Sequence, residues 1–247
     1  MIIQQPLRIA MWSGPRNIST ALMRSWGNRP DTFVCDEPFY AHYLAQTKLP
    51  HPGADEVIRH QENDWRKVVG WLTGPIPQGK SIFYQKHMAH HLLPNMERGW
   101  LDNVANCFLI RPPREMLASL LHFLPQPTLA DTGLPQQLEI FHQVRERSGR
   151  TPPILDARDV LGHPQRTLGA LCDALNVPFD EAMLSWPPGP RSTDGVWAKH
   201  WYAAVEKTTC FQPYKPKDDP VPDSLLPLLA QCEELYHQLY SHRLHER

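Results

Sequence analysis

The stretch LRIAMWSGPRNISTAL (residues 7–22) decides the fold of this chain. Residues 7–12 form an apolar run of strand length, residues 13–17 have the composition of a loop, and residues 18–26 have the pattern of a helix. A strand, a short loop and a helix in this order direct unpaired backbone N–H groups and the positive end of a helix dipole at one point. The stretch therefore predicts an anion-binding loop.

The same alternation of short apolar runs and longer amphipathic runs continues along the chain. Further strands are predicted over residues 32–35, 81–85, 107–110 and 154–155, and helices over residues 55–72, 113–124, 164–175 and 224–240. This order predicts an α/β fold with a mostly parallel central sheet flanked by helices on both faces. In such sheets ligands bind outside the carboxyl ends of the strands.

Length and composition indicate one globular domain over residues 1–247. Of these residues 41% are hydrophobic and 21% are charged. The polar, proline-rich segments at about residues 44–79 and 186–222 are long for a compact domain, so we expect them to cover a substrate. The formal net charge of −1 argues against a general nucleic-acid binder, which needs a broad basic field.

Targeting and redox signals are weak. No apolar stretch reaches the roughly 20 residues of a membrane-spanning helix, and the N-terminus is too short and interrupted for a signal peptide. The five cysteines form no CxxC pair, which argues against a disulfide framework and against structural zinc. We therefore expect a cytoplasmic protein without a membrane partner. The sequence does not indicate its oligomeric state.

The predicted loop offers more than backbone groups to an anion. Arg16 adds a full positive charge, and Ser19 and Thr20 add hydroxyl donors. The simplest alternative is an ordinary helix cap by Asn17 or Ser19. The ATP-binding motif GxxxxGK[ST], counted from Gly14, requires glycine where Ser19 stands and lysine where Thr20 stands. The loop therefore lacks the lysine that contacts the outer phosphates of ATP.

The segment PRNISTAL (residues 15–22) resembles the 5′-phosphosulfate loop of sulfotransferases. In that family a proline and a basic residue precede small residues and a Ser/Thr pair that opens a helix. One position departs from the pattern, because Ile18 stands where members usually have glycine. The resemblance implies a P-loop NTPase-like fold and the sulfuryl donor 3′-phosphoadenosine 5′-phosphosulfate (PAPS). It implies donor contacts from Gly14, Pro15, Arg16, Asn17, Ile18, Ser19 and Thr20.

PAPS also carries a 3′-phosphate, which requires a second cationic pocket. Residues 107–121 (CFLIRPPREMLASLL) place Arg111 at the end of an apolar run and Ser119 eight positions later. The two can flank one group only if the strand end folds back over the helix. Taken alone, they are better explained by an arginine–carboxylate pair and a serine on a helix face. Their spacing is nevertheless similar to the 3′-phosphate motif of sulfotransferases.

Two further segments extend the resemblance, which covers roughly residues 7–185. Residues 155–184 resemble the stretch in which an acidic–leucine turn and a proline precede a helix ending in L-x-V-P-F. Many sulfotransferases also close a late arginine–glycine loop over the adenosine and its 3′-phosphate. Arg191, Gly195 and Trp197 are candidates for that loop, although a plain surface loop fits them equally well.

Sulfuryl transfer to a hydroxyl or an amine needs a general base within hydrogen-bond reach of the acceptor. Glu37, at the end of the second predicted strand, is similar in place to the proposed base of tyrosylprotein sulfotransferases. His87 follows Lys86 and resembles the lysine–histidine segment of cytosolic sulfotransferases, with the histidine one place closer to the lysine. We expect Glu37 to be the base and His87 to orient it or to share the proton. His90 and His91 are nearby substitutes.

The cations have expected roles as well. Arg16 and Lys86 should stabilise the bridging and 5′-phosphate oxygens, where negative charge builds. Arg111 and Ser119 should bind the 3′-phosphate. No metal is implied, because PAPS has a good leaving group and no carboxylate or cysteine completes a metal site with the three neighbouring histidines.

Two other function classes stay open. A P-loop kinase or NTPase would need magnesium and a strand-end aspartate, for which Asp36 is the candidate. The Ile18 departure also suits a non-catalytic nucleotide-binding module on a sulfotransferase scaffold. The acceptor is not identified by the sequence. Aromatic residues in or near the predicted covering segments suit either an aromatic or apolar acceptor or core packing: Phe39, Tyr40, Tyr43, Trp65, Trp71, Trp197, Trp201 and Tyr202.

Overall fold

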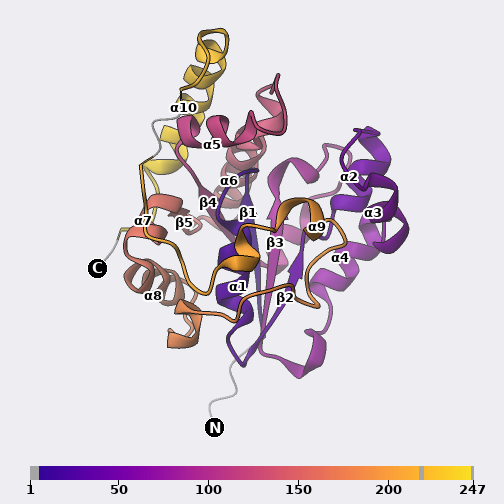
Figure 1. Ribbon diagram of the computed structural model, residues 1–247. Coiled ribbons are helices and arrows are strands. Elements are labelled where there is room, and N and C mark those ends of the chain that lie inside the picture. The colour runs from indigo at the N-terminus through magenta and orange to yellow at the C-terminus, as the bar shows by residue number, and fades with distance from the viewer. Residues whose placement is uncertain (1–5, 217–219, 246–247) are drawn as a thin grey trace.

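The computed structural model describes residues 6–216 and 220–245 and has a single parallel sheet at its centre (Figure 1). The strand order is β2-β3-β1-β4-β5, so the first strand lies in the middle. This order confirms the predicted α/β fold with P-loop-like topology. The strands are β1 (Leu7–Ser13), β2 (Thr32–Asp36), β3 (Ile82–Met88), β4 (Ala105–Ile110) and β5 (Ile154–Asp156).

Helices cover both faces of the sheet (Figure 1). Successive side chains of a strand point to opposite faces, and β1 supplies both cores in this way. Ile9 and Met11 pack with α1 (Ser19–Gly27), α7 (Ala157–Gly162) and α8 (Pro164–Ala174). Ala10 and Trp12 pack with α4 (Trp65–Thr73), α6 (Leu134–Ser148) and α10 (Leu226–Tyr240). The remaining α-helices are α2 (Tyr40–Thr47), α3 (Ala54–His60), α5 (Pro113–Leu120) and α9 (Ala198–Trp201).

Several predicted elements differ from the structure. The single helix expected over residues 55–72 is wrong: α3 and α4 are separate, because the Asp64 side chain accepts a hydrogen bond from the Arg66 N–H and starts α4 anew. The strand expected over residues 81–85 extends to Met88 and so contains Lys86 and His87. Helix α6 was not predicted, because most of its surface is polar and few of its residues are buried.

The two long proline-rich segments have different places. Within residues 44–79, α4 buries Trp65, Val68 and Leu72 in the main core, so this part is a structural layer. Residues 191–202, here called the strap, run along edge strand β2 and end at Tyr202, which packs with Trp197 against α2. The strap is therefore the segment that reaches the carboxyl end of the sheet.

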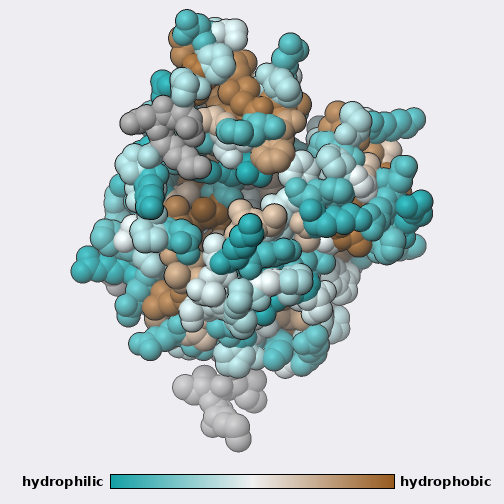
Figure 2. All heavy atoms as spheres, in the orientation of Figure 1, coloured by the Kyte–Doolittle hydropathy of each residue, from teal (hydrophilic) through white to brown (hydrophobic). Residues whose placement is uncertain are grey.

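The surface carries few large apolar side chains. Phe123 is 50% exposed and Leu226 is 43% exposed, and hydrophobic atoms gather over the ends of α5 and α10 on the face that Figure 2 shows. In the described ranges, none of the helices combines the length and apolar character needed to cross a bilayer. Cys35, Cys107 and Cys172 are buried free thiols.

Candidate active site

The loop between β1 and α1 lies at the carboxyl end of the sheet and is tightly packed from behind. A Cβ atom added to Gly14 would lie 2.4 Å from the carbonyl oxygen of Thr132, so this position requires glycine. Arg16 adopts a left-handed backbone conformation with φ of 55°. Non-glycine residues adopt this conformation at a cost, and such strain concentrates at functional sites.

Helix α1 starts without a side-chain cap. Ile18 occupies the cap position, and its side chain packs against the core beside α1. Asn17 instead ties the loop together: its amide donates to the Leu109 carbonyl, and its oxygen accepts from the Ile18 N–H. The first turn contains no acidic residue. An ordinary cap by Asn17 or Ser19 is thus not formed, and the first turn of α1 offers no carboxylate to neutralise the positive end of the helix.

The two predicted anion-binding segments meet. Arg16 Nε donates to Ser119 Oγ at 3.0 Å, and Arg111 Nη1 donates to the Arg16 carbonyl at 2.6 Å. Arg111, which follows β4, and Ser119, in the last turn of α5, thus both contact Arg16. Burial and the neighbouring Arg111 cation both lower the pKa of Arg16. Two guanidinium groups held this close form a site that suits an anion.

Glu115 organises the outer side of this cationic cluster. One carboxylate oxygen lies 3.4 Å from Arg111, while the other accepts from Arg158 at 2.9 Å and from the Tyr214 hydroxyl at 2.6 Å. Burial opposes ionisation, but the hydrogen bonds from Tyr214 and Arg158 outweigh it and lower the pKa of Glu115. The arginine–carboxylate pair left open for Arg111 is thus formed with Glu115, whereas Arg158 and Tyr214 were not named from the sequence. The acidic residue four positions after Arg111, on the first turn of a predicted helix, was the available signal.

Aromatic rings border the cluster on its open side. The Arg16 guanidinium lies 4.4 Å from the centroid of the Phe123 ring, which in turn contacts Trp201 of the strap edge-to-face at 5.2 Å. The molecular surface is hollowed between α5 and α9 on this face (Figure 2). Segments far apart in the sequence thus meet above the loop.

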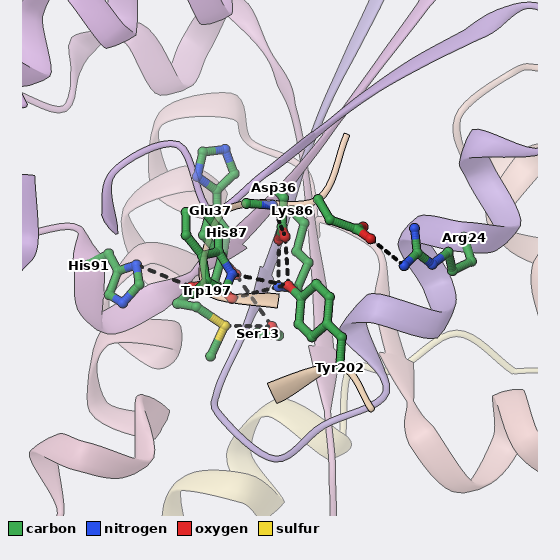
Figure 3. A network of polar contacts seen from close by, with 12 residues as sticks. Ser13, Arg24, Asp36, Glu37, Lys86, His87, His91, Trp197 and Tyr202 are labelled. Atoms are coloured by element: carbon green, nitrogen blue, oxygen red, sulfur yellow. Dashed lines mark hydrogen bonds and ion pairs between the residues drawn. The ribbon is translucent and has the colours of Figure 1, made fainter. Parts of the chain in front are cut away.

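Lys86 is the centre of a buried polar network (Figure 3). Its ammonium group donates to Asp36 at 2.8 Å, to Glu37 at 2.6 Å and to the Tyr202 hydroxyl at 2.9 Å. Tyr202 in turn donates to Asp36 at 2.6 Å. Burial disfavours the charged ammonium, but the two carboxylates outweigh it and raise the pKa of Lys86 well above its ordinary value.

Glu37 follows β2, and only one of its two carboxylate oxygens accepts a hydrogen bond from Lys86. Oε1 accepts from Lys86, whereas Oε2 lies 3.9 Å from His91 Nδ1. Burial raises the pKa of Glu37, Lys86 opposes this, and Asp36 adds to it, so the pKa stays above the ordinary value. A carboxylate whose pKa is shifted toward neutrality is suited to accept a proton.

His87 is not placed as predicted. Adjacent residues of a strand face opposite sides of the sheet, so the ring turns away from Lys86 (Figure 3). It stacks on Trp12 and Phe39 and shares a hydrogen bond with Gln85. Burial and the Lys86 charge lower its pKa to about 3. No contact with Glu37 is formed, so His87 is a neutral core residue in this structure.

His91 lies where a histidine partner of Glu37 was expected. It stacks between the rings of Tyr40 and Tyr43. Burial and then the His90 neighbour lower its pKa well below the ordinary value. Its Nδ1 atom makes no hydrogen bond within the described part of the chain. Of the two substitutes named from the sequence, the structure thus brings His91 to the base.

Arg191 and Asp36 also differ from expectation. Arg191 lines a pocket with Thr32 and Lys80, at the amino end of the sheet, and its guanidinium donates to the Pro187 carbonyl. It is not near the loop after β1. Asp36, which a magnesium-dependent alternative would need, is already engaged by Lys86 and Tyr202. Within the described ranges no three histidine, cysteine or acidic side chains gather as metal ligands do.

Comparison with known proteins identifies the family. A family model described as a sulfotransferase domain matches residues 7–239, which is nearly the whole chain. The chain belongs to the sulfotransferase family. The matched residues include the loop after β1, the end of β4 and the Lys86 network. The site described above therefore lies within the sulfotransferase domain.

Two curated relatives come from Arabidopsis thaliana and are named branched-chain-amino-acid aminotransferase-like proteins 1 and 2. Each is 35% identical to this sulfotransferase domain, over 98% and 96% of it respectively. The match covers 43% and 42% of those proteins, so the chain spans less than half the length of the curated relatives that it matches. Their names therefore describe proteins with much additional sequence.

Solved structures share the fold. The sulfotransferase domain of the Synechococcus PCC 7002 olefin synthase aligns over 99% of this chain and 98% of its own, with a TM-score of 0.58 and 17% identity. The sulfotransferase from Alicyclobacillus acidocaldarius aligns over 96% and 97%, with a TM-score of 0.52 and 10% identity. At these identities the likeness concerns the fold alone.

Proposed function

We propose that this sulfotransferase-family protein transfers a sulfuryl group from PAPS to a hydroxyl, or an amine, of a small-molecule acceptor. The observation that carries the proposal is the contact of Arg16 with Ser119 and of Arg111 with the Arg16 carbonyl. PAPS carries a 5′-phosphosulfate and a 3′-phosphate on one ribose, so it requires two anion-binding segments side by side. In this role Gly14–Thr20 hold the 5′ end, and Arg111 with Ser119 holds the 3′-phosphate.

In the proposed step the acceptor oxygen forms a bond to sulfur while the bond between sulfur and the 5′-phosphate oxygen breaks. The acceptor proton goes to Oε2 of Glu37, because Oε1 is held by Lys86. The products are a sulfate ester and adenosine 3′,5′-bisphosphate. Arg16 meets the negative charge that builds on the leaving phosphate. Lys86 fixes the orientation of Glu37. Its ammonium group already donates to Asp36, Glu37 and Tyr202, so the role at the 5′-phosphate oxygens that was expected from the sequence is not assigned to it.

The aromatic side chains beside Glu37 support a proposal for the class of acceptor. Tyr40, Tyr43 and His91 form a stacked aromatic wall there, and Phe123 with Trp201 borders the hollow above Arg16. Such surfaces favour an acceptor with an apolar or aromatic body. Most of the aromatic side chains named from the sequence are buried in the core. They therefore support the wall of the site and expose little surface to an acceptor.

Nucleotide preference tests the proposal. Calorimetric titration should show much tighter binding of adenosine 3′,5′-bisphosphate than of 5′-AMP. Arg111→Ala should reduce this preference by roughly ten- to a hundred-fold, because a hydrogen bond to a charged group contributes about 1.5–3 kcal/mol. Arg147→Ala, which removes an exposed arginine paired with Asp102, is the matched control and should leave the preference unchanged.

Three outcomes would reject the proposal. Equal affinity of the wild-type protein for both nucleotides would remove the need for a 3′-phosphate pocket. Magnesium-dependent ATP turnover without sulfate transfer would assign the protein to the kinase or NTPase class. Tight bisphosphate binding without transfer of labelled sulfate from PAPS to any acceptor in a metabolite extract would identify a non-catalytic nucleotide-binding module.

A further inference from the structure

A second polar pocket lies at the amino end of the sheet, opposite the loop after β1. It has a volume of about 300 Å³, at the small end of the range for ligand sites. Its walls are the end of α1, the start of β2, the turn before β3 and the strap. The basic side chains that line it are Arg24, Arg29, Lys80 and Arg191, and the hydroxyl-bearing ones are Thr32, Ser192 and Thr193.

Two of the four cations are neutralised. Arg29 forms an ion pair with Asp31 at 2.8 Å, and Arg24 forms one with Asp194 of the strap at 2.7 Å. Both arginine side chains are almost fully buried. Arg24 nevertheless retains a buried Nη1 group that makes no hydrogen bond to any described residue. A buried guanidinium N–H without an acceptor is costly and favours an additional anionic or oxygen partner.

The other two cations are not neutralised. Lys80 Nζ donates to the Pro30 carbonyl at 2.7 Å, and Arg191 donates to the Pro187 carbonyl at 2.5 Å. Carbonyl oxygens are neutral, so both charges persist. No acidic residue is among the described residues that line the pocket. The Thr32 hydroxyl already donates to Asp31. The pocket therefore has an excess of about two positive charges together with the hydroxyl groups of Ser192 and Thr193, which is the donor set of a dianion site.

Capping of α1 does not account for these cations. The carbonyls of the last turn of α1 already accept hydrogen bonds from the backbone: Asn28 N–H donates to Arg24 and Ser25, and Arg29 N–H donates to Trp26. A helix C-terminus otherwise attracts basic side chains to its unsatisfied carbonyls. Among the described residues, neither Lys80 nor Arg191 is paired with a carboxylate, and each donates to a neutral carbonyl instead.

We propose that this pocket binds a small dianion that carries a phosphate or sulfate group, in addition to the donor site at the other end of the sheet. The two places are distinct, because β2 alone spans roughly 16 Å between them. In Figure 3 Arg24 lies at the side of the Lys86 network, where it pairs with Asp194 of the strap. The proposal goes beyond the transfer reaction and gives a role to Arg191, which the fold keeps away from the donor loop.

The test uses the full chain first saturated with adenosine 3′,5′-bisphosphate, which occupies the donor site. Inorganic phosphate and, separately, inorganic sulfate are then titrated by calorimetry. We expect one further binding event, weakened at least ten-fold in the double variant Lys80→Ala/Arg191→Ala. The matched control Lys67→Ala/Arg147→Ala removes the same two charges from exposed ion pairs and should bind as the wild type does.

A second readout guards against misfolding of the variant. Phosphate should raise the thermal midpoint of the wild type and the control but not that of the double variant, and Arg191→Gln is the milder change if the double variant unfolds. Absence of binding to the saturated wild type, or equal binding by variant and wild type, would overturn the proposal. Failure of the bisphosphate to bind would instead reject the transferase proposal, while the comparison between the variants would still decide this one.

Phenyl phosphate separates the two sources of the same chemistry. Tighter binding of phenyl phosphate than of inorganic phosphate would assign the pocket to an ester. The reverse order would assign it to the free ion. Either order must be abolished by Lys80→Ala/Arg191→Ala for the site to be the one proposed.

Discussion

At the scale of single residues, Glu37 has the strongest case for chemistry. It is buried, its pKa is raised, and only one of its oxygens is taken by Lys86. Glu37 could be selected from the sequence because it follows a predicted strand, and ligands bind outside the carboxyl ends of parallel strands. The same reasoning could not reveal that Asp36 shares the lysine, because that depends on the register of β2 against β3.

Glu37→Gln should lower the rate of sulfate transfer by about 10²–10⁴-fold, the usual contribution of a general base. Binding of adenosine 3′,5′-bisphosphate should stay near that of the wild type, since the donor loop is untouched. The base must be deprotonated, so the wild-type rate should fall as the pH drops through the raised pKa of Glu37, and the variant should lack this limb. The rate is measured with labelled PAPS and an acceptor found in the extract. A variant with the wild-type rate would contradict the assignment.

At the scale of elements, strand alternation decides which side chains share a site. Lys86 and His87 are neighbours in the sequence, yet β3 places them on opposite faces, and His87 stacks within the Trp12 core. The prediction failed because the strand was ended at Gln85. If the predicted strand had been extended by three residues, the alternation of side chains along it would have placed Lys86 and His87 on opposite faces of the sheet, and so not in one site. Helix α6 was missed because its buried stripe is narrow.

His87→Phe should make the stability of the protein less sensitive to acid. The folded state keeps His87 neutral down to about pH 3, whereas the unfolded chain binds a proton near pH 6.5. The histidine therefore lowers the free energy of unfolding as the pH falls from about 6.5 toward 3, by up to about 1.4 kcal/mol for each pH unit. Phenylalanine retains the ring stacking and removes this dependence. Urea unfolding at pH 7 and pH 5 measures the difference, and identical pH dependence in both proteins would refute it.

At the scale of the whole molecule, the fold and the meeting of the two anion-binding segments were predictable. The fold follows from the strand–loop–helix order, and parallel strands bring their carboxyl ends to one edge. The second anion-binding segment was predicted from its resemblance to the 3′-phosphate motif of sulfotransferases. The contribution of the strap was not. Tyr202 and Trp197 lie far along the chain from Asp36 and Lys86, and no local pattern links them. The position of Arg191 was predicted wrongly for the same reason. The path of a loop across a sheet depends on tertiary packing, which the hydrophobic periodicity of the sequence does not reveal.

Tyr202→Phe tests this long-range connection. Loss of the hydroxyl removes partners from both Lys86 and Asp36 in a buried network, which should lower the free energy of unfolding by about 1–3 kcal/mol. Tyr240→Phe is the control, because that hydroxyl makes no hydrogen bond to any residue in the described ranges. Denaturant titration of both variants gives the comparison. Equal stability losses would show that the strap is not anchored through this hydroxyl.

The strap is fastened at several points along its length: Asp194 to Arg24, Gly195 to Asp36, and Tyr202 to the lysine network. A segment that is held by contacts at both ends tolerates substitutions between these contacts more easily than insertions or deletions. Related proteins should consequently vary freely in composition at the exposed positions 199 and 200 while keeping the same spacing. One inserted or deleted residue there would move Tyr202 away from Asp36 and Lys86. The strap would then no longer link the amino end of the sheet to its carboxyl end.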